Sequence, residues 1–112
     1  MENISWLEFE KVEMRVGTIL EVHDFPEARK PAYQLTIDFG SVLGIRKTSA
    51  QITTRYQKED LLNRQIVAVV NFPKKQIGKF MSECLVLGAV GELGDVILLA
   101  PDFKIDNGLR IG

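Results

Sequence analysis

Three kinds of side chain in this sequence could do chemistry: a thiol, an imidazole and a close pair of carboxylates. Cys84 is the only cysteine, so it can form neither an internal disulfide nor a Cys-based zinc cluster. It lies in Glu83 to Gly88, a run typical of a strand, which favours a packed core thiol over a nucleophile. His23 is the only histidine and has no second imidazole or cysteine to complete a metal or catalytic set. We interpret it as a solvated loop residue.

The carboxylates of Glu92 and Asp95 lie in a turn that contains glycine, and no Gly-rich phosphate loop accompanies them. General acid and base catalysis needs convergent partners for such groups, and the sequence offers none. A solvated turn is the simpler interpretation. The sequence therefore predicts no catalytic residue, no metal site and no cofactor, and favours a binding protein over an enzyme.

The segment Asn71–Ser82 has a different character, since it combines three lysines, two phenylalanines and small polar groups within twelve residues. Ammonium groups can contact phosphates, and aromatic rings can stack on bases. The alternative is a solvated hairpin in which Phe72 and Phe80 face the core and the lysines prevent edge-to-edge strand pairing. Composition leaves both interpretations open.

Charge is distributed unevenly along the chain, although the net charge is only −1. Residues 1–38 carry four basic and eight acidic side chains, and residues 83–112 carry two and five. Residues 39–82 carry eight basic and two acidic side chains, a net charge of +6. This basic block also contains Arg46, Lys47, Arg55 and Lys58, which would lie beside the Asn71–Ser82 segment only in a suitable topology.

Length and composition bound the architecture that must position these residues. The 112 residues are 46% hydrophobic and 26% charged, which predicts one globular domain over residues 1–112. No apolar run approaches the roughly 20 residues that span a bilayer. Residues 1–10 lack the basic and apolar regions of a signal peptide, so we expect a cytoplasmic protein without membrane insertion.

The N-terminal part predicts a helical turn followed by a long strand. Ser5 and Glu8 have the spacing of a capping box for a turn over Ser5–Glu10, which is too short to be stable unless it packs on something. Apolar residues then alternate through Val12–Phe25, as in a strand with one buried face. Gly17 in its middle suggests a bulge or bend of the kind that curls a sheet.

The rest of the chain predicts further strands and one short helix within Thr53–Asn63. We expect strands over residues 33–39, 42–48, 65–72, 84–89 and 96–100. Three strands, a short helix and at least two more strands form the order of an all-β, five-stranded OB-fold barrel with the helix between strands three and four. The N-terminal helical turn and a C-terminal extension would be added to this barrel. Another small β-barrel topology remains the alternative.

Several motifs resemble one known family across nearly the whole chain. They include Met14–Ile19, Phe25–Arg29, Ile37–Gly40, Ser49–Thr53, Val69–Pro73 and Ser82–Glu83. They are similar to the tRNA-binding OB domains appended to methionyl- and phenylalanyl-tRNA synthetases, and more closely to the CsaA-type chaperones. Ala50 and Phe72 depart from the synthetase pattern and resemble the CsaA branch.

The resemblance implies a function and an assembly. CsaA-type proteins are thought to hold unfolded or export-bound precursor polypeptides during protein secretion, whereas other members of the family bind tRNA. The resemblance thus implies a chaperone, with a structure-specific tRNA-binding, or RNA-binding, protein as the alternative. It also implies a homodimer in which the N-terminal turn and the C-terminal segments cross between subunits. The apolar anchors of the turn, which this interface would bury, are Trp6, Leu7 and Phe9.

The resemblance also assigns site residues to this chain. Those implied for tRNA or peptide binding are Arg46, Lys47, Ser49, Asn71, Phe72, Lys74, Lys75, Lys79, Phe80, Met81 and Ser82. Glu83 would orient the strand beside them. Phe72, Ile77, Phe80 and Met81 are the candidates for apolar contact with a polypeptide, because an adaptable apolar surface suits varied partners.

Overall fold

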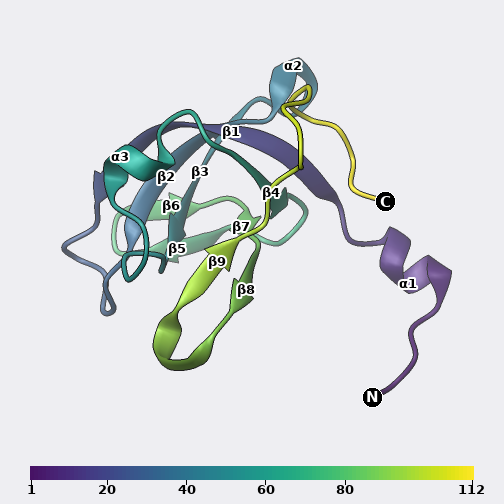
Figure 1. The fold of residues 1–112 in the computed structure, drawn as a ribbon, viewed down its shortest axis with the longest axis horizontal. Helices are drawn as coiled ribbons and strands as arrows, with labels where there is room; N and C mark the ends of the chain where they lie inside the picture. Colours follow the sequence, from purple (N-terminus) through teal and green to yellow (C-terminus); the bar gives the residue numbers. More distant parts are fainter.

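A five-stranded antiparallel sheet, curled into a nearly closed barrel, forms the centre of the molecule (Figure 1). The computed structural model describes residues 1–112. The sheet order is β3-β2-β1-β4-β7, with β1 Met14–Asp24, β2 Tyr33–Asp38, β3 Ile45–Ala50, β4 Gln65–Val69 and β7 Leu85–Val86. This arrangement confirms the predicted all-β, OB-like barrel.

Two hairpins and four short helical segments complete the fold. The hairpins are β5 Lys75–Ile77 with β6 Phe80–Ser82, and β8 Gly88–Val90 with β9 Val96–Leu98. The helical segments are α1 Trp6–Glu10, α2 Gly40–Leu43, α3 Lys58–Leu61 and the 3-10 turn η1 Glu92–Gly94. The short helix predicted between the third and fourth strands is α3. No helix in the structure is long and apolar enough to cross a membrane.

Side chains from the inner face of the sheet and from α3 fill the barrel. Ile19, Ile37 and Ile66 come from three neighbouring strands and are fully buried, as is Leu61 of α3. The near-continuous apolar run of β4, within the strand predicted over 65–72, is buried along almost its whole length. In the sheet, β4 lies between β1 and β7, and β1 is the central strand.

Two local predictions on glycines were wrong. The strand predicted over 42–48 begins only at Ile45, because Gly40 (φ +91°) and Gly44 (φ +77°) adopt left-handed conformations at the ends of the helical turn α2. The irregularity in β1 lies between Ile19 and Glu21 rather than at Gly17. A Cβ on Gly17 would lie 2.6 Å from Ile37 Cγ2, so this glycine permits close packing instead of forming the bulge.

The two ends of the chain are placed differently, since the C-terminal segment lies beside the first half of β1 and the N-terminal helix α1 does not. The predicted capping box of α1 is present, with the N–H of Glu8 donating to Ser5 Oγ and the N–H of Ser5 donating to Glu8 Oε1. No residue of α1 is buried, and the helix projects away from the barrel (Figure 1). The C-terminal segment pairs with β1, where the N–H of Val16 donates to the carbonyl of Leu109 over 3.0 Å.

Candidate functional site

The β5–β6 hairpin is fastened to β3 by a small set of polar contacts. Thr48 is 1% exposed, and its hydroxyl donates to the carbonyl of Cys84 over 2.6 Å and lies 2.9 Å from Ser82 Oγ. The N–H of Glu83 donates to the carbonyl of Lys47 over 2.7 Å, and Glu83 Oε1 accepts from the N–H of Lys47 over 3.0 Å. The basic pair of β3 therefore lies beside the hairpin, as the OB topology predicts.

A shallow groove of about 650 Å³ opens at this junction, which we refer to as the front groove. Its lining comprises Phe72, Pro73, Lys74, Lys75, Gln76, Ser82, Cys84 and Leu85. Phe72 and Leu85 expose 52% and 46% of their surface, so apolar area is open to solvent beside the lysines of this groove. The lining is thus mixed, with apolar and cationic side chains together.

A second groove, of about 490 Å³, lies between the two hairpins, and we refer to it as the side groove. It is lined by β3 and the residues after it on one side and by β7 and β8 on the other. The two grooves share Lys75, Ser82, Cys84 and Leu85. The two grooves therefore adjoin each other at β7 and the base of the hairpin.

The cations of this surface differ in how they are paired. Lys74 Nζ lies 3.5 Å from Glu83 Oε2, while the other carboxylate oxygen of Glu83, Oε1, accepts from the N–H of Lys47 in β3. Lys47, Lys75 and Lys79 make no ion pair in the structure. We refer to the surface formed by Lys47, Ser49, residues 72–75, Ser82 and Leu85 as the hairpin face. It carries positive charge that the protein itself does not neutralise.

Three predicted site residues lie apart from the front groove. Lys79 and Phe80 line a separate depression of about 480 Å³ at the tip of the hairpin, where the rings of Phe80 and Phe25 lie 5.3 Å apart. Met81 pairs with Gln76 in the ladder, so its side chain lies on the opposite face of the hairpin from Ser82. The hairpin thus holds Phe80 inward and Met81 outward.

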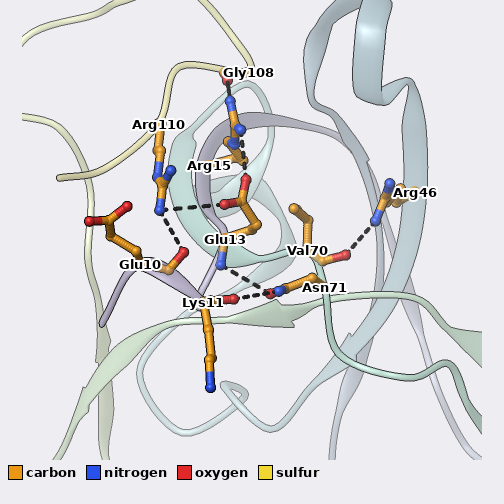
Figure 2. A network of polar contacts seen from close by, with 9 residues as sticks. All are labelled: Glu10, Lys11, Glu13, Arg15, Arg46, Val70, Asn71, Gly108 and Arg110. Carbon is orange, nitrogen blue, oxygen red and sulfur yellow. Dashed lines mark hydrogen bonds and ion pairs between the residues drawn. The ribbon is translucent and has the colours of Figure 1, made fainter. Parts of the chain in front are cut away.

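Asn71 and Arg46 contact the protein's own backbone in this structure (Figure 2). The Asn71 amide donates to the carbonyl of Lys11 over 2.6 Å and accepts from the N–H of Glu13 over 3.0 Å. Arg46 Nη1 donates to the carbonyl of Val70 over 2.7 Å. Both side chains therefore hold backbone segments of the protein in place beside the front groove. The sequence pattern did not indicate this role.

Arg55 and Lys58, the other members of the basic block considered, are not part of the hairpin face. Arg55 makes a two-pronged contact with Asp95, at 2.9 and 2.7 Å. Lys58 Nζ lies 2.9 Å from Asp24 Oδ2. The Arg55 contact lowers the pKa of Asp95, chiefly through its hydrogen bonds. Glu92 and Asp95 thus do not form a paired-carboxylate site.

Several groove residues were not assigned from the sequence, namely Pro73, Leu85, Val90 and Val96. An apolar run such as Leu85–Leu87 predicts burial. Part of this run is exposed because β3 and β7 diverge after Thr48 and Cys84. Cys84 is buried, as expected for a core thiol, and burial raises its pKa to about 11. His23 lies in β1 rather than in a loop, with its exposed ring 3.0 Å from Glu21 Oε1.

A second polar cluster, the terminal junction, joins Glu10, Glu13, Arg15, Gly108 and Arg110 (Figure 2). Glu13 Oε1 lies 2.7 Å from Arg15 Nη2, and Glu13 Oε2 lies 3.4 Å from Arg110 Nη2. Arg15 also donates to the carbonyl of Gly108 over 3.0 Å, and Arg110 to that of Glu10 over 2.8 Å. The hydrogen bond from Arg15 lowers the pKa of Glu13.

The terminal junction fixes the base of α1, whose apolar side chains remain open to solvent. Trp6 and Leu7 are 69% and 72% exposed, and the ring of Phe9 lies 5.6 Å from that of Trp6. No group of three or more His, Cys, Asp or Glu that could hold a metal ion comes together in the structure.

Comparison with known proteins gives matches over almost the whole chain. The family model described as "Putative tRNA binding domain" matches residues 14–110. Methionine–tRNA ligases from Nitrosomonas eutropha and Pyrococcus furiosus are 38% and 37% identical over 98% and 99% of this chain. The chain spans only 15% of the length of each of these ligases.

Solved structures match over their full length. Crystal structures of the chaperone CsaA from Bacillus anthracis and Picrophilus torridus are each 50% identical, with TM-scores of 0.93 and 0.91. They cover 99% and 98% of this chain and all of their own. A methionyl-tRNA synthetase-related protein from Pyrococcus horikoshii is 26% identical, with a TM-score of 0.87 over the whole of both chains.

Proposed function

The chain belongs to the tRNA-binding domain family, and we propose that within it the chain is a CsaA-type chaperone that holds unfolded or export-bound polypeptides. The hairpin face would be the binding surface, and no reaction would be catalysed there. The front groove carries this proposal, because its lining combines the exposed side chains of Phe72 and Leu85 with Lys74 and Lys75. Clients held before export would meet the protein in the cytoplasm.

The physical basis is the mixed lining of the front groove. Unfolded segments carry apolar side chains, and burying them against Phe72, Pro73 and Leu85 removes apolar surface from water. Lysines at the rim attract acidic segments and keep the loaded complex soluble by net charge. An open, shallow groove selects little for shape, which suits a protein that must accept many sequences.

The test is suppression of aggregation of a denatured client, together with the binding of unfolded peptides. The substitution Phe72→Ser should weaken both, since Phe72 is the largest exposed apolar group in the groove. Val42→Ser is the matched control, because Val42 is exposed but lies in α2, outside the hairpin face. A wild-type protein that neither suppressed aggregation nor bound unfolded peptides would exclude the proposal.

A second candidate function is the binding of tRNA. The observation that favours it is the unpaired positive charge of Lys47, Lys75 and Lys79, in a chain whose family is described by tRNA binding. Lysines contact phosphates without reading sequence, so this function predicts recognition of shape and strong dependence on salt. Competition between tRNA and an unfolded peptide at two salt concentrations separates the two functions.

We also propose that residues 1–112 act as one domain that pairs with a second copy through α1. A five-residue helix is marginal in water, and Trp6 and Leu7 present apolar surface that nothing in the chain covers. A two-fold interface over Trp6, Leu7 and Phe9 would bury it. Trp6→Ser with Leu7→Ser should shift sedimentation from dimer to monomer, and unchanged sedimentation would exclude this interface.

A further inference from the structure

One edge of the strand running from Leu85 to Val90 is unpaired. On the paired edge, the N–H of Leu87 donates to the carbonyl of Val67 over 2.9 Å, and its carbonyl accepts from the N–H of Leu99 over 3.1 Å. Backbone groups of successive residues in a strand point to alternate edges. The groups on the other edge, which form no hydrogen bond within the chain, belong to Val86, Gly88 and Val90.

This free edge borders the side groove. Val86, Gly88 and Val90 all line the groove, and Ser49–Ile52 of β3 and its continuation line the opposite wall. The contact between Thr48 and Cys84 is the last side-chain link that closes the barrel here. Beyond it, a groove of about 490 Å³ separates the two walls.

The walls of the side groove are apolar and one end is cationic. Nine of its fourteen lining residues are hydrophobic, among them Ile52, Ile77 and Val96. Lys75 lies where the side groove meets the front groove and has no acidic partner. The edge itself carries valine, glycine and alanine, without the lysine or proline that usually keeps an exposed edge from pairing.

We propose that an extended segment of an unfolded polypeptide binds here by adding a strand to the Val86–Val90 edge. Its backbone would pair with Val86, Gly88 and Val90, every second side chain would enter the side groove, and an acidic side chain would reach Lys75. This inference rests on the proposed chaperone function and adds its mode of binding. Main-chain pairing explains how one site accepts many sequences, because every polypeptide has the same backbone.

The chemistry of the side groove favours a polypeptide over a nucleic acid. Alternating N–H and C=O groups along an edge match the backbone of an extended peptide. A nucleic acid strand would need several cations along its phosphates, and Lys75 is the only cation in the lining. An RNA would instead contact Lys47, Lys74 and Lys75 on the hairpin face.

Backbone N-methylation of a probe peptide tests the pairing directly. The probe is an extended peptide of about eight alternating valine and threonine residues with one terminal glutamate. N-methyl groups are placed either on its odd-numbered or on its even-numbered amides. One set should lose roughly 10- to 100-fold in affinity, because its methyl groups block two or three bonds to the edge. The other set should bind within about threefold of the parent, since its amides face solvent.

The outcomes separate this inference from the proposed function. Equal affinities for the two methylated peptides, with tight binding of the parent, would exclude strand addition while leaving polypeptide holding intact. If the parent peptide did not bind at all while the protein still suppressed client aggregation, strand addition at the Val86–Val90 edge would be excluded and the proposed function would not. Failure of both peptide binding and aggregation suppression would exclude both.

Hydrogen exchange locates the bound strand on the protein. The parent peptide should slow exchange of the Gly88 and Val90 amides at least tenfold, whereas that of Ala89, already paired with β9, should change little. If these two amides were already protected in the free protein, increasingly so at higher protein concentration, the edge would be a contact between copies and the inference would be wrong. Val90→Pro should weaken peptide binding more than Val90→Ala, because only proline removes the free donor.

Discussion

The hairpin face and the terminal junction both contain basic side chains, but these side chains differ in whether they have partners within the chain. At the terminal junction, Arg15 and Arg110 share the carboxylate of Glu13 and donate to backbone carbonyls, so both side chains are held by groups of the chain itself. On the hairpin face, Lys47 and Lys75 have no acidic partner. Charge that is paired internally orders the protein, and charge that is left unpaired is available to a ligand.

The border between the two regions runs through residues 70–72. Asn71 joins the terminal junction by its contacts with Lys11 and Glu13, although its neighbour Phe72 lines the front groove. Arg46 holds the carbonyl of Val70 from the side of β3. Adjacent residues thus serve different regions, and substitutions can test where the border lies.

The largest expected effect is on tRNA binding, and it concerns the positive charge of the β5–β6 hairpin and the residue before it. The triple substitution Lys74→Ala, Lys75→Ala and Lys79→Ala should lower affinity for tRNA on the order of 100-fold at about 0.1 M salt. The magnitude of the slope of log affinity against log salt should fall by about 2 to 3, because binding releases fewer counterions when three phosphate contacts are lost. Filter binding over a range of salt concentrations measures both.

The matched control for that experiment removes three positive charges elsewhere. Arg29, Lys30 and Lys104 are exposed, and their replacement by alanine gives the same net charge. The salt slope of this control should stay close to that of the wild type. Equal losses in the two triple variants would mean that net charge, rather than the hairpin face, attracts tRNA.

The next effect concerns the buried hydroxyl that fastens the hairpin to β3. Thr48→Val keeps the shape of the side chain but leaves the carbonyl of Cys84 without its donor, so the free energy of unfolding should fall by about 1–3 kcal/mol. Urea denaturation measures this change. The exposed Thr54, changed to valine, should stay within about 0.5 kcal/mol of the wild type. No loss in Thr48→Val would mean that packing alone holds the hairpin.

Asn71 gives a smaller effect that tests the border. Asn71→Ala removes two hydrogen bonds to the backbone of Lys11 and Glu13, so the free energy of unfolding should fall by about 1 kcal/mol. Exchange of the Glu13 amide should become faster. Asn3→Ala, at an exposed position that makes no side-chain contact, is the control. Unchanged stability with weaker tRNA binding would instead make Asn71 a ligand contact, as the sequence motif implies.

The smallest effect is the pH dependence of the terminal junction. Arg15 lowers the pKa of Glu13 in the folded state from its usual 4.5, so this stabilisation is complete above about pH 4.5. It is lost as the pH falls through the lower, folded-state value. Glu13→Gln should therefore lose less stability on acidification than the wild type. Glu2→Gln, which removes a carboxylate without an arginine partner, should behave as the wild type.

Local patterns were enough to predict the order of the elements. Alternation over residues 12–25, the apolar run of β4 and the capping residues Ser5 and Glu8 each gave the correct element, because strands and caps depend on neighbours in sequence. The helical turn α2 was missed because Val42 and Ile45 suit a strand, while the conformations of the two flanking glycines decide the structure.

The sites were harder to predict, since a side chain's partner usually lies far away in sequence. Nothing around Arg55 indicates that it contacts Asp95 rather than a ligand, and nothing around Asn71 indicates Lys11. The side groove exists because two strands diverge after Thr48 and Cys84, which is a property of the barrel and not of either segment. The sequence indicated which residues carry charge, but not which of them remain free.

The pairing of β1 with the C-terminal segment also determines when the terminal junction can form during synthesis. Arg15 contacts Gly108, 93 residues later, so the junction cannot close while a ribosome is still making the residues between them. At about 5–20 residues per second this delay is roughly 5–20 s. During that interval α1 is attached to an incomplete barrel, and its apolar side chains are exposed to solvent. The exposed turn would therefore emerge well before the C-terminal residues that anchor it.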